Sequence, residues 1–168
     1  MHSARIEQLL NLVGALRPDL DSAELYELAV GGLSDLSGYP AVVMWRAETA
    51  HTLRPLNYVG LSDSQQARMR SARLPLNVLD VLRQHLHSSG EAIWWPADRG
   101  LPSDAAALGI VAYAGGHSLL LPMLYNQLLG VVVLSGPQPQ PEAKTTAFLQ
   151  QCVDQVTVAL AAADTVKA

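Results

Sequence analysis

The chain has 168 residues and a formal net charge of −4, with 49% hydrophobic, 15% charged and 5% aromatic residues. This length predicts one domain with a single core, because a domain of about 150 residues buries roughly 68–70% of its unfolded surface. The charged fraction is below the roughly 25% that is usual in soluble proteins, which excludes a disordered chain and predicts exposed apolar surface that meets a partner.

Charge and cysteine usage exclude several classes of protein. The basic residues are scattered, which argues against nucleic-acid binding. Cys152 is the only cysteine, so neither an internal disulfide nor a cysteine-based zinc site can form. The longest apolar runs, 119–125 and 128–134, are far shorter than the ~20 residues that span a bilayer, and no secretory signal follows Met1. We therefore expect a cytoplasmic protein with no nucleic-acid or membrane partner.

Two amphipathic helices are predicted in residues 1–38. Apolar residues recur at helical spacing over 4–16, and Pro18 ends this helix because a residue before proline avoids the helical region. A capping-box pattern at 21–24 begins a second helix, which runs to about Leu36.

A sheet and its connections are predicted in residues 39–136. Strands at 41–46 and 52–59 form a hairpin, and Pro55 places the second strand at a sheet edge or at a bulge. Because side chains alternate along a strand, Val43 and Trp45 lie on the same face of the first strand. This alternation leaves open which of the two faces lines a pocket. The further elements predicted up to residue 113 are a short helix from a capping pattern at 62–65, a helix at 77–88, a strand at 92–95 and a small helix at 102–113.

The clearest signal is a hairpin at 116–136, with two apolar strands around a tight turn at Asn126-Gln127, since asparagine tolerates positive φ. The last helix, in residues 141–165, has apolar residues alternately four and three apart, which is heptad-like over only two heptads. Hairpins separated by helices indicate an α+β class and not parallel βαβ repeats.

This order of elements resembles the GAF domain family over residues 25–158. The most specific match is the last hairpin, with Pro122 in its first strand and Gly130 near the start of an apolar second strand. The resemblance implies a GAF-like central antiparallel sheet with helices on both faces and the N- and C-terminal helices packed together on one face. It also implies, as in many members, a small-molecule pocket beside the sheet. The related PAS fold usually lacks the two leading helices and the long terminal helix.

Within that resemblance, the aromatic residues of the middle segment mark a candidate pocket, with core packing as the alternative. His117 follows two glycines at the mouth of a strand expected to line it. This histidine could orient a ligand or bind haem iron, and the alternative is a histidine bonded to backbone. The candidate ligand-binding residues are Trp45, Tyr58, Trp94, Tyr113, His117, Leu119 and Leu121.

The terminal helices have apolar stripes that we expect to meet both the sheet and a second subunit. Low charge thus points to the outer faces of 6–16 and 149–163 as the surface of a homodimer. The candidate dimer-interface residues are Leu9, Val13, Leu149, Val153, Val156 and Leu160.

No catalytic or metal motif is found. The glycine pairs at 31–32 and 115–116 lack the other residues of a phosphate loop, and no nucleophile elbow occurs. His85 and His87 point to different faces of a helix, so they cannot hold one metal ion together. Some GAF domains attach bilins, and one GAF enzyme class reduces free methionine sulfoxide, through cysteines near the pocket. Cys152 lies in the terminal helix without a resolving cysteine, so we expect neither bilin attachment nor reductase activity. Together with the missing motifs, this predicts no catalytic residue, metal or haem.

The sequence therefore predicts a single GAF-like domain, 1–168, that acts as a non-catalytic sensory or regulatory module of signal transduction. Its expected partners are a second copy, an unidentified small molecule, and an effector such as a histidine kinase in the same or a separate chain. Two alternatives stay open. One is an enzyme resembling free methionine sulfoxide reductase, and the other is a purely structural dimerisation module without a ligand.

Overall fold

Two helices begin the chain, each where the spacing of apolar residues predicts one. The computed structural model describes residues 2–16, 22–49, 52–70, 74–75, 92–95 and 117–167. Helix α1 spans His2–Ala15 and α2 spans Ser22–Ser37. Gly38 ends α2 with a φ of 77°, and its N–H donates to the Ser34 carbonyl at 2.9 Å. A left-handed glycine at this position is a common way for a helix to stop.

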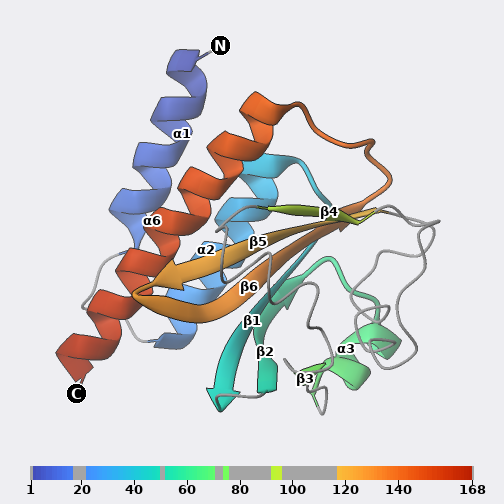
Figure 1. Ribbon diagram of the computed structural model, residues 1–168, viewed down its shortest axis with the longest axis vertical. Helices are drawn as coiled ribbons and strands as arrows, with labels where there is room; N and C mark the ends of the chain where they lie inside the picture. The colour runs from blue at the N-terminus through green and yellow to red at the C-terminus, as the bar shows by residue number, and fades with distance from the viewer. Residues whose placement is uncertain are drawn as a thin grey trace.

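In the described residues, six strands form one antiparallel sheet in the order β3-β2-β1-β6-β5-β4. The strands are β1 (Ala41–Thr49), β2 (Thr52–Val59), β3 (Leu74–Pro75), β4 (Ile93–Trp95), β5 (His117–Tyr125) and β6 (Gln127–Gly136). The predicted hairpins are β1–β2 and β5–β6, and the pairing of β1 with β6 joins them at the centre of the sheet (Figure 1).

The turn of the β5–β6 hairpin is at Asn126, as predicted. Its φ is 64°, in the left-handed region that asparagine enters more readily than most residues. Further along β6, Gly130 lies against β1, where a Cβ atom would collide with the carbonyl oxygen of Trp45. The glycine therefore lets the two hairpins approach closely.

Pro55 lies beside an irregularity in the pairing of β1 with β2. Met44 pairs with Asn57, but the next residue, Trp45, pairs with Pro55, so β2 has one extra residue at this point. On its other side, β2 pairs with β3 at Thr52 and Leu53, and this pairing does not reach Pro55. The bulge predicted at Pro55 is therefore confirmed.

The predicted capping box forms at the start of α3 (Asp63–Met69). The Gln65 N–H donates to Ser62 Oγ at 3.3 Å, and the Ser62 N–H donates to Gln65 Oε1 at 2.8 Å. These reciprocal bonds satisfy two backbone donors that the first turn of a helix leaves free.

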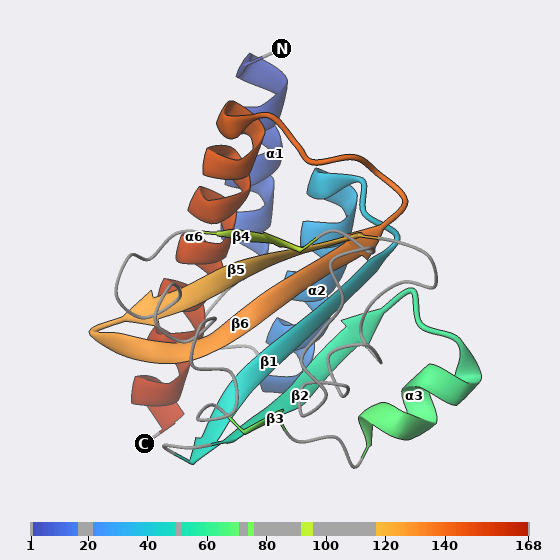
Figure 2. The same ribbon diagram turned by 45° about the vertical axis from the view of Figure 1, so that its right-hand side comes forward.

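Helices α1, α2 and α6 (Ala143–Lys167) cover one face of the sheet, which we call the helix face. Figures 1 and 2 show α2 and α6 lying across the sheet and α1 alongside them, so the first and last helices pack together as expected. The buried strand residues of the helix face are Val42, Met44, Leu119, Leu121, Met123, Val132 and Leu134.

The apolar stripe of α6 packs into the chain's own core, which corrects the predicted dimer interface. Leu149, Val153, Val156 and Leu160 are buried together with the strand residues of the helix face. A helix that packs on a sheet needs the same spacing of apolar residues as a coiled-coil helix, so the heptad-like pattern could not separate the two. On α1, Leu9 also packs against this core.

Val13 is the one predicted interface residue that lies at the surface, with 38% of its area exposed. The α+β class is confirmed by the antiparallel sheet and its helix layer. The predicted helices at 77–88 and 102–113 lie outside the described residues. Within the described ranges, no helix combines the length and the apolar character needed to cross a membrane.

Candidate functional site

The second face of the sheet carries a buried, largely apolar surface that we call the Trp45 face. Alternation along each strand turns these side chains away from α2 and α6, and the strand pairings place Val43 beside Val133 and Trp45 beside Val131. The buried residues of the Trp45 face include Ala41, Val43, Trp45, Ser118, Leu120, Val131, Val133 and Ser135.

The indole nitrogen of Trp45 is the most unusual polar atom of this face. Trp45 is fully buried, and in the described structure its Nε1 has no hydrogen-bond partner. A tryptophan N–H normally finds an acceptor when it is buried, because an unpaired donor costs free energy. The Trp45 face therefore holds a donor that an acceptor on a bound molecule could satisfy.

Two serine hydroxyls lie at the other end of the same face. Ser118 Oγ and Ser135 Oγ are 3.0 Å apart, and both residues are buried. Two hydroxyls carry two protons, and their mutual hydrogen bond uses only one. Ser135 pairs with Ala41, which is four residues from Trp45 on β1, so this pair lies about 13 Å from Trp45 along the strand.

The predicted pocket residues do not surround one site, because the sheet separates them. Trp45 lies on the Trp45 face, and the pairing of Tyr58 with Val43 places Tyr58 there too. Leu119 and Leu121 belong to the helix-face core. Strand alternation was predicted, but the sequence does not say which set of alternating residues the helices cover.

Trp94 and His117 also belong to the helix face. Trp94 pairs with Leu119 and packs against the helix-face core, and its ring centroid lies 5.3 Å from that of His117, with the rings tilted by 39°. This contact places His117 beside an aromatic ring at the sheet edge and not on the Trp45 face. Tyr113 lies outside the described residues.

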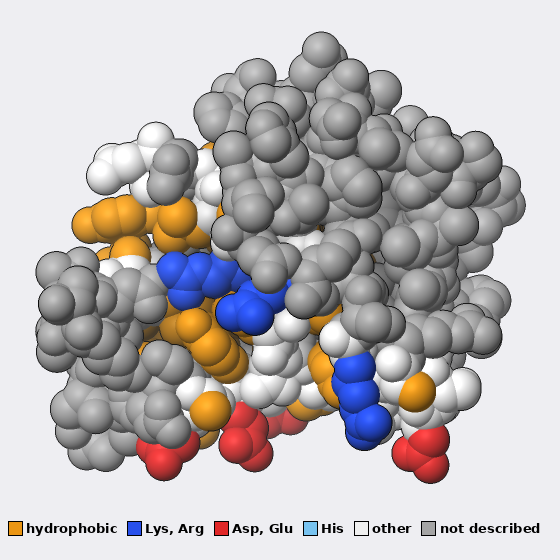
Figure 3. Space-filling view, turned by 90° about the horizontal axis from the view of Figure 1, so that it is seen from below, with side chains coloured by type: hydrophobic (Ala, Val, Ile, Leu, Met, Phe, Trp, Pro, Cys, Tyr) orange, Lys and Arg blue, Asp and Glu red, His pale blue; other side chains and the backbone are white. Residues whose placement is uncertain are grey.

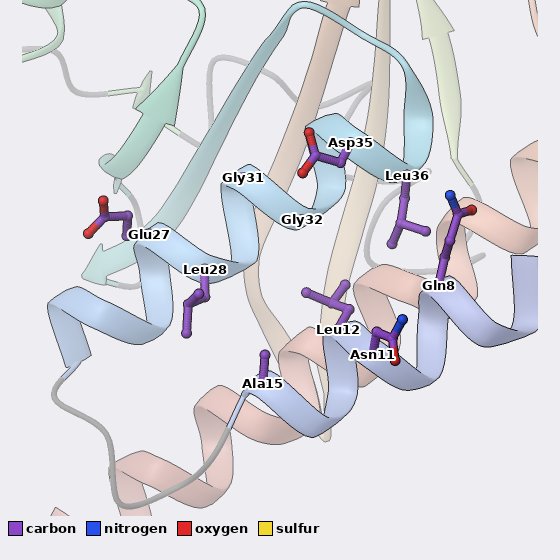
Figure 4. A pocket seen from close by; sticks show the side chains of 10 residues that line it. All are labelled: Gln8, Asn11, Leu12, Ala15, Glu27, Leu28, Gly31, Gly32, Asp35 and Leu36. Atoms are coloured by element: carbon purple, nitrogen blue, oxygen red, sulfur yellow. The ribbon is translucent and has the colours of Figure 1, made fainter.

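A groove that the sequence interpretation missed lies between α1 and α2, with a volume of about 420 Å³ (Figure 4). Its α1 side and its α2 side each supply polar and apolar side chains. The lining residues are Gln8, Asn11, Leu12, Ala15, Glu27, Leu28, Gly31, Gly32, Asp35 and Leu36. The only signal in the sequence was the glycine pair at 31–32 inside an otherwise good helix.

The remaining chemistry of the described residues is sparse. Burial raises the pKa of the Cys152 thiol to about 11, and its side chain lies within the helix-face core. Reactive cysteines have a lowered pKa and are partly exposed, so Cys152 has the opposite properties. Within the described ranges, no three histidine, cysteine, aspartate or glutamate residues come together as a metal site.

Charged side chains of both signs lie on the face of the molecule that Figure 3 shows. Seen from below, basic side chains form two groups, one toward the middle of the view and one nearer its lower edge, where acidic side chains also lie (Figure 3). One basic residue connects the sheet to the helix layer. Arg46 Nη1 of β1 donates to the Tyr26 hydroxyl of α2 at 3.1 Å.

Comparison with known proteins identifies the architecture. No model of a known protein family matches the sequence, and no curated protein matches it. Among solved structures, the GAF domain of an Acinetobacter phosphoenolpyruvate-protein phosphotransferase aligns with a TM-score of 0.72 and 15% identity, over 98% of this chain and 97% of that chain. The chain has the GAF-domain fold.

Two further solved structures are similar to this GAF-like domain. The phycocyanobilin-bound GAF domain of a cyanobacterial phytochrome has a TM-score of 0.72 and 14% identity, over 96% of both chains. Residues 122 to 287 of a methyl-accepting chemotaxis protein have a TM-score of 0.72 and 20% identity, over 94% of this chain and 99% of that chain. The predicted GAF resemblance is thereby confirmed at the level of the fold.

Proposed function

We propose that this GAF-like domain is a non-catalytic sensory module of signal transduction in the cytoplasm, which binds a small molecule on the Trp45 face. The observation that carries the proposal is the buried, unpartnered Nε1 of Trp45. The buried, high-pKa thiol of Cys152 speaks against the alternative of a thiol-dependent reductase. The similarity to a segment of a chemotaxis protein and to the GAF domain of a phytochrome supports a sensory role.

The chemistry of the Trp45 face defines the ligand that we expect. Val43, Leu120, Val131 and Val133 are buried apolar side chains of this face, and the indole N–H is one buried donor. Sites for small molecules are usually apolar with a few well-placed polar groups. The expected ligand is therefore largely apolar and presents a hydrogen-bond acceptor, such as a carbonyl or carboxylate oxygen, to Trp45.

Strand β1 provides a route from this face to the helices. Val43 and Trp45 alternate with Val42 and Met44, which belong to the core shared with the helices α1, α2 and α6. A ligand that binds one arrangement of the helices more tightly shifts the population toward it, by a coupling of typically about 1–3 kcal/mol. The helix layer would carry this bias to an effector.

Thermal melts with nucleotides and small metabolites test ligand binding. A ligand at about 100 times its Kd should raise the Tm by about 5–10 °C. Trp45→Phe should remove most of this shift, because it deletes the indole N–H donor and keeps an aromatic side chain. Trp94→Phe makes the same change on the helix face and should keep the shift. An unchanged shift in Trp45→Phe would overturn the assignment of the site.

The proposed module dimerises through exposed apolar residues of its terminal helices. Leu10 of α1 is 64% exposed, Val13 lies one turn further along the helix, and Val158 of α6 is 48% exposed. Exposed large apolar side chains on two neighbouring helices are typical of an interaction surface. These residues replace the buried stripe of α6 in the predicted interface.

Sedimentation at micromolar concentration tests the dimer. The wild-type chain should sediment as a dimer, and Leu10→Asp combined with Val158→Asp should sediment as a folded monomer. Tyr125→Asp is the matched control, because Tyr125 is similarly exposed but lies at the β5–β6 turn. A wild-type monomer, or equal effects of the control and the helix variants, would contradict this interface.

A further inference from the structure

The groove between α1 and α2 has an apolar floor and two acidic residues on its α2 side. Leu12, Leu28 and Leu36 contribute apolar surface between the helices, while Glu27 and Asp35 are exposed on α2 with their carboxylates directed away from α1 (Figure 4). The α1 side adds only the neutral amides of Gln8 and Asn11 as polar groups. None of the ten lining residues is a lysine or an arginine, so the lining offers no compensating cation.

Glycine at position 31 keeps this groove open. A Cβ atom at Gly31 would meet nothing within 4 Å, so packing inside the chain does not require glycine there. Glycine in the middle of a helix is unfavourable relative to alanine. Its presence on the floor is explained if a side chain of a partner approaches the α2 backbone closely at this point.

We propose that this groove binds an amphipathic helix of a partner protein, with lysine or arginine residues along the edge that faces α2. Helices commonly dock their apolar face into a groove of this kind. Glu27 and Asp35 are eight residues apart, or about 12 Å along α2, which matches basic residues seven or eight positions apart on the docked helix. The proposal does not depend on whether the Trp45 face binds a ligand.

The described helices of a second copy of the chain do not have basic residues at this spacing. Among the four helices that the structure describes, none has two lysine or arginine residues seven or eight positions apart. A different protein with a basic helix therefore fits the charge of the groove better than self-association.

A designed peptide tests the proposal directly. The probe is a fluorescein-labelled helix of about 18 residues, or five turns, with leucine and alanine on one face and lysines seven positions apart on one edge. Its binding to the full chain is measured by fluorescence anisotropy. The double variant Glu27→Lys with Asp35→Lys should weaken binding at least about tenfold, or 1.4 kcal/mol. Gly31→Leu should also weaken it, because the leucine side chain would occupy the floor.

The matched control is Glu142→Lys with Asp154→Lys, which changes the net charge equally at two exposed positions, one just before α6 and one within it. It should leave the affinity within about twofold, which is a minor free-energy change. In NMR spectra the peptide should shift the amide signals of Gly31 and Gly32. Equal weakening by the control, unchanged binding to Gly31→Leu, or shifts confined to another surface would overturn the proposal. The proposal would also be overturned if the peptide does not bind and Gly31→Leu converts a wild-type dimer into a monomer. The groove would then be occupied by a second copy of the chain.

Discussion

Gly32 of α2 lies directly against Leu12 of α1. A Cβ atom at Gly32 would come within 2.5 Å of Leu12 Cδ1, whereas a Cβ atom at the neighbouring Gly31 would touch nothing within 4 Å. The two glycines therefore do different things. Gly32 allows the two helices to pack closely, and Gly31 leaves open space beside that contact.

Alanine substitutions should separate these roles. Gly31→Ala should raise the free energy of unfolding by about 0.5–1 kcal/mol, because alanine favours the helix and meets no neighbour. Gly32→Ala should be less stable than Gly31→Ala by about 1 kcal/mol or more, since the buried Leu12 side chain must move. Urea unfolding of both variants measures this difference, and equal stabilities would show that Leu12 does not hold the position assigned to it.

The hydroxyl pair of Ser118 and Ser135 should show strong coupling. Ser135→Ala should lower the free energy of unfolding by about 1–3 kcal/mol, because it leaves the buried Ser118 hydroxyl without its partner. Adding Ser118→Ala should cost little more, since no unpaired hydroxyl then remains. A double-mutant cycle from urea unfolding gives the coupling directly, and additive effects would argue that the two hydroxyls are not bonded.

The two surfaces of α6 should respond differently to truncation. Leu149→Ala should lower the free energy of unfolding by about 2–5 kcal/mol, as usual for a buried leucine. In the folded monomer, where Val158 is exposed, Val158→Ala should change it by no more than about 0.5 kcal/mol. Chemical unfolding of both variants, measured at the same protein concentration, tests this prediction. Comparable losses would contradict the placement of α6 on the sheet.

Stability should fall at alkaline pH. Burial raises the pKa of the Cys152 thiol from 9.0 to about 11, so the folded chain holds this proton more tightly than the unfolded chain. This contribution is fully present below pH 9 and is lost as the pH rises toward 11. Burial also raises the pKa of Tyr39 above 10.0, which adds a loss of the same sign at higher pH.

The variant Cys152→Ala isolates the thiol. Its free energy of unfolding should depend less on pH between 9 and 11 than that of the wild type, because one titrating group is gone. Tyr39→Phe serves as the parallel control for the tyrosine. Should the pH dependence of Cys152→Ala equal that of the wild type, the thiol does not contribute.

Local features of the fold could be predicted where neighbouring residues determine them. The left-handed turn at Asn126, the capping box of Ser62 and Gln65, and the bulge beside Pro55 all follow from the conformational preferences of a few adjacent residues. The arrangement of the elements does not follow from these local preferences. It was predicted correctly from the resemblance of the order of elements to GAF domains.

Features that depend on distant segments could not be predicted. Which face of β1 carries the helix core depends on α2 and α6, so Leu119 and Leu121 were grouped with Trp45, although the sheet lies between them. The groove at Gly31 was missed for the same reason, since it exists only where α1 lies beside α2.

Native mass spectrometry of the purified full chain tests the sensory account most directly, because it reports a retained ligand and the oligomeric state together. The account predicts a dimer whose mass includes an apolar molecule with a hydrogen-bond acceptor. This extra mass should be absent from Trp45→Phe and retained in Trp94→Phe. A monomer without added mass, together with no Tm shift in the metabolite screen, would contradict it.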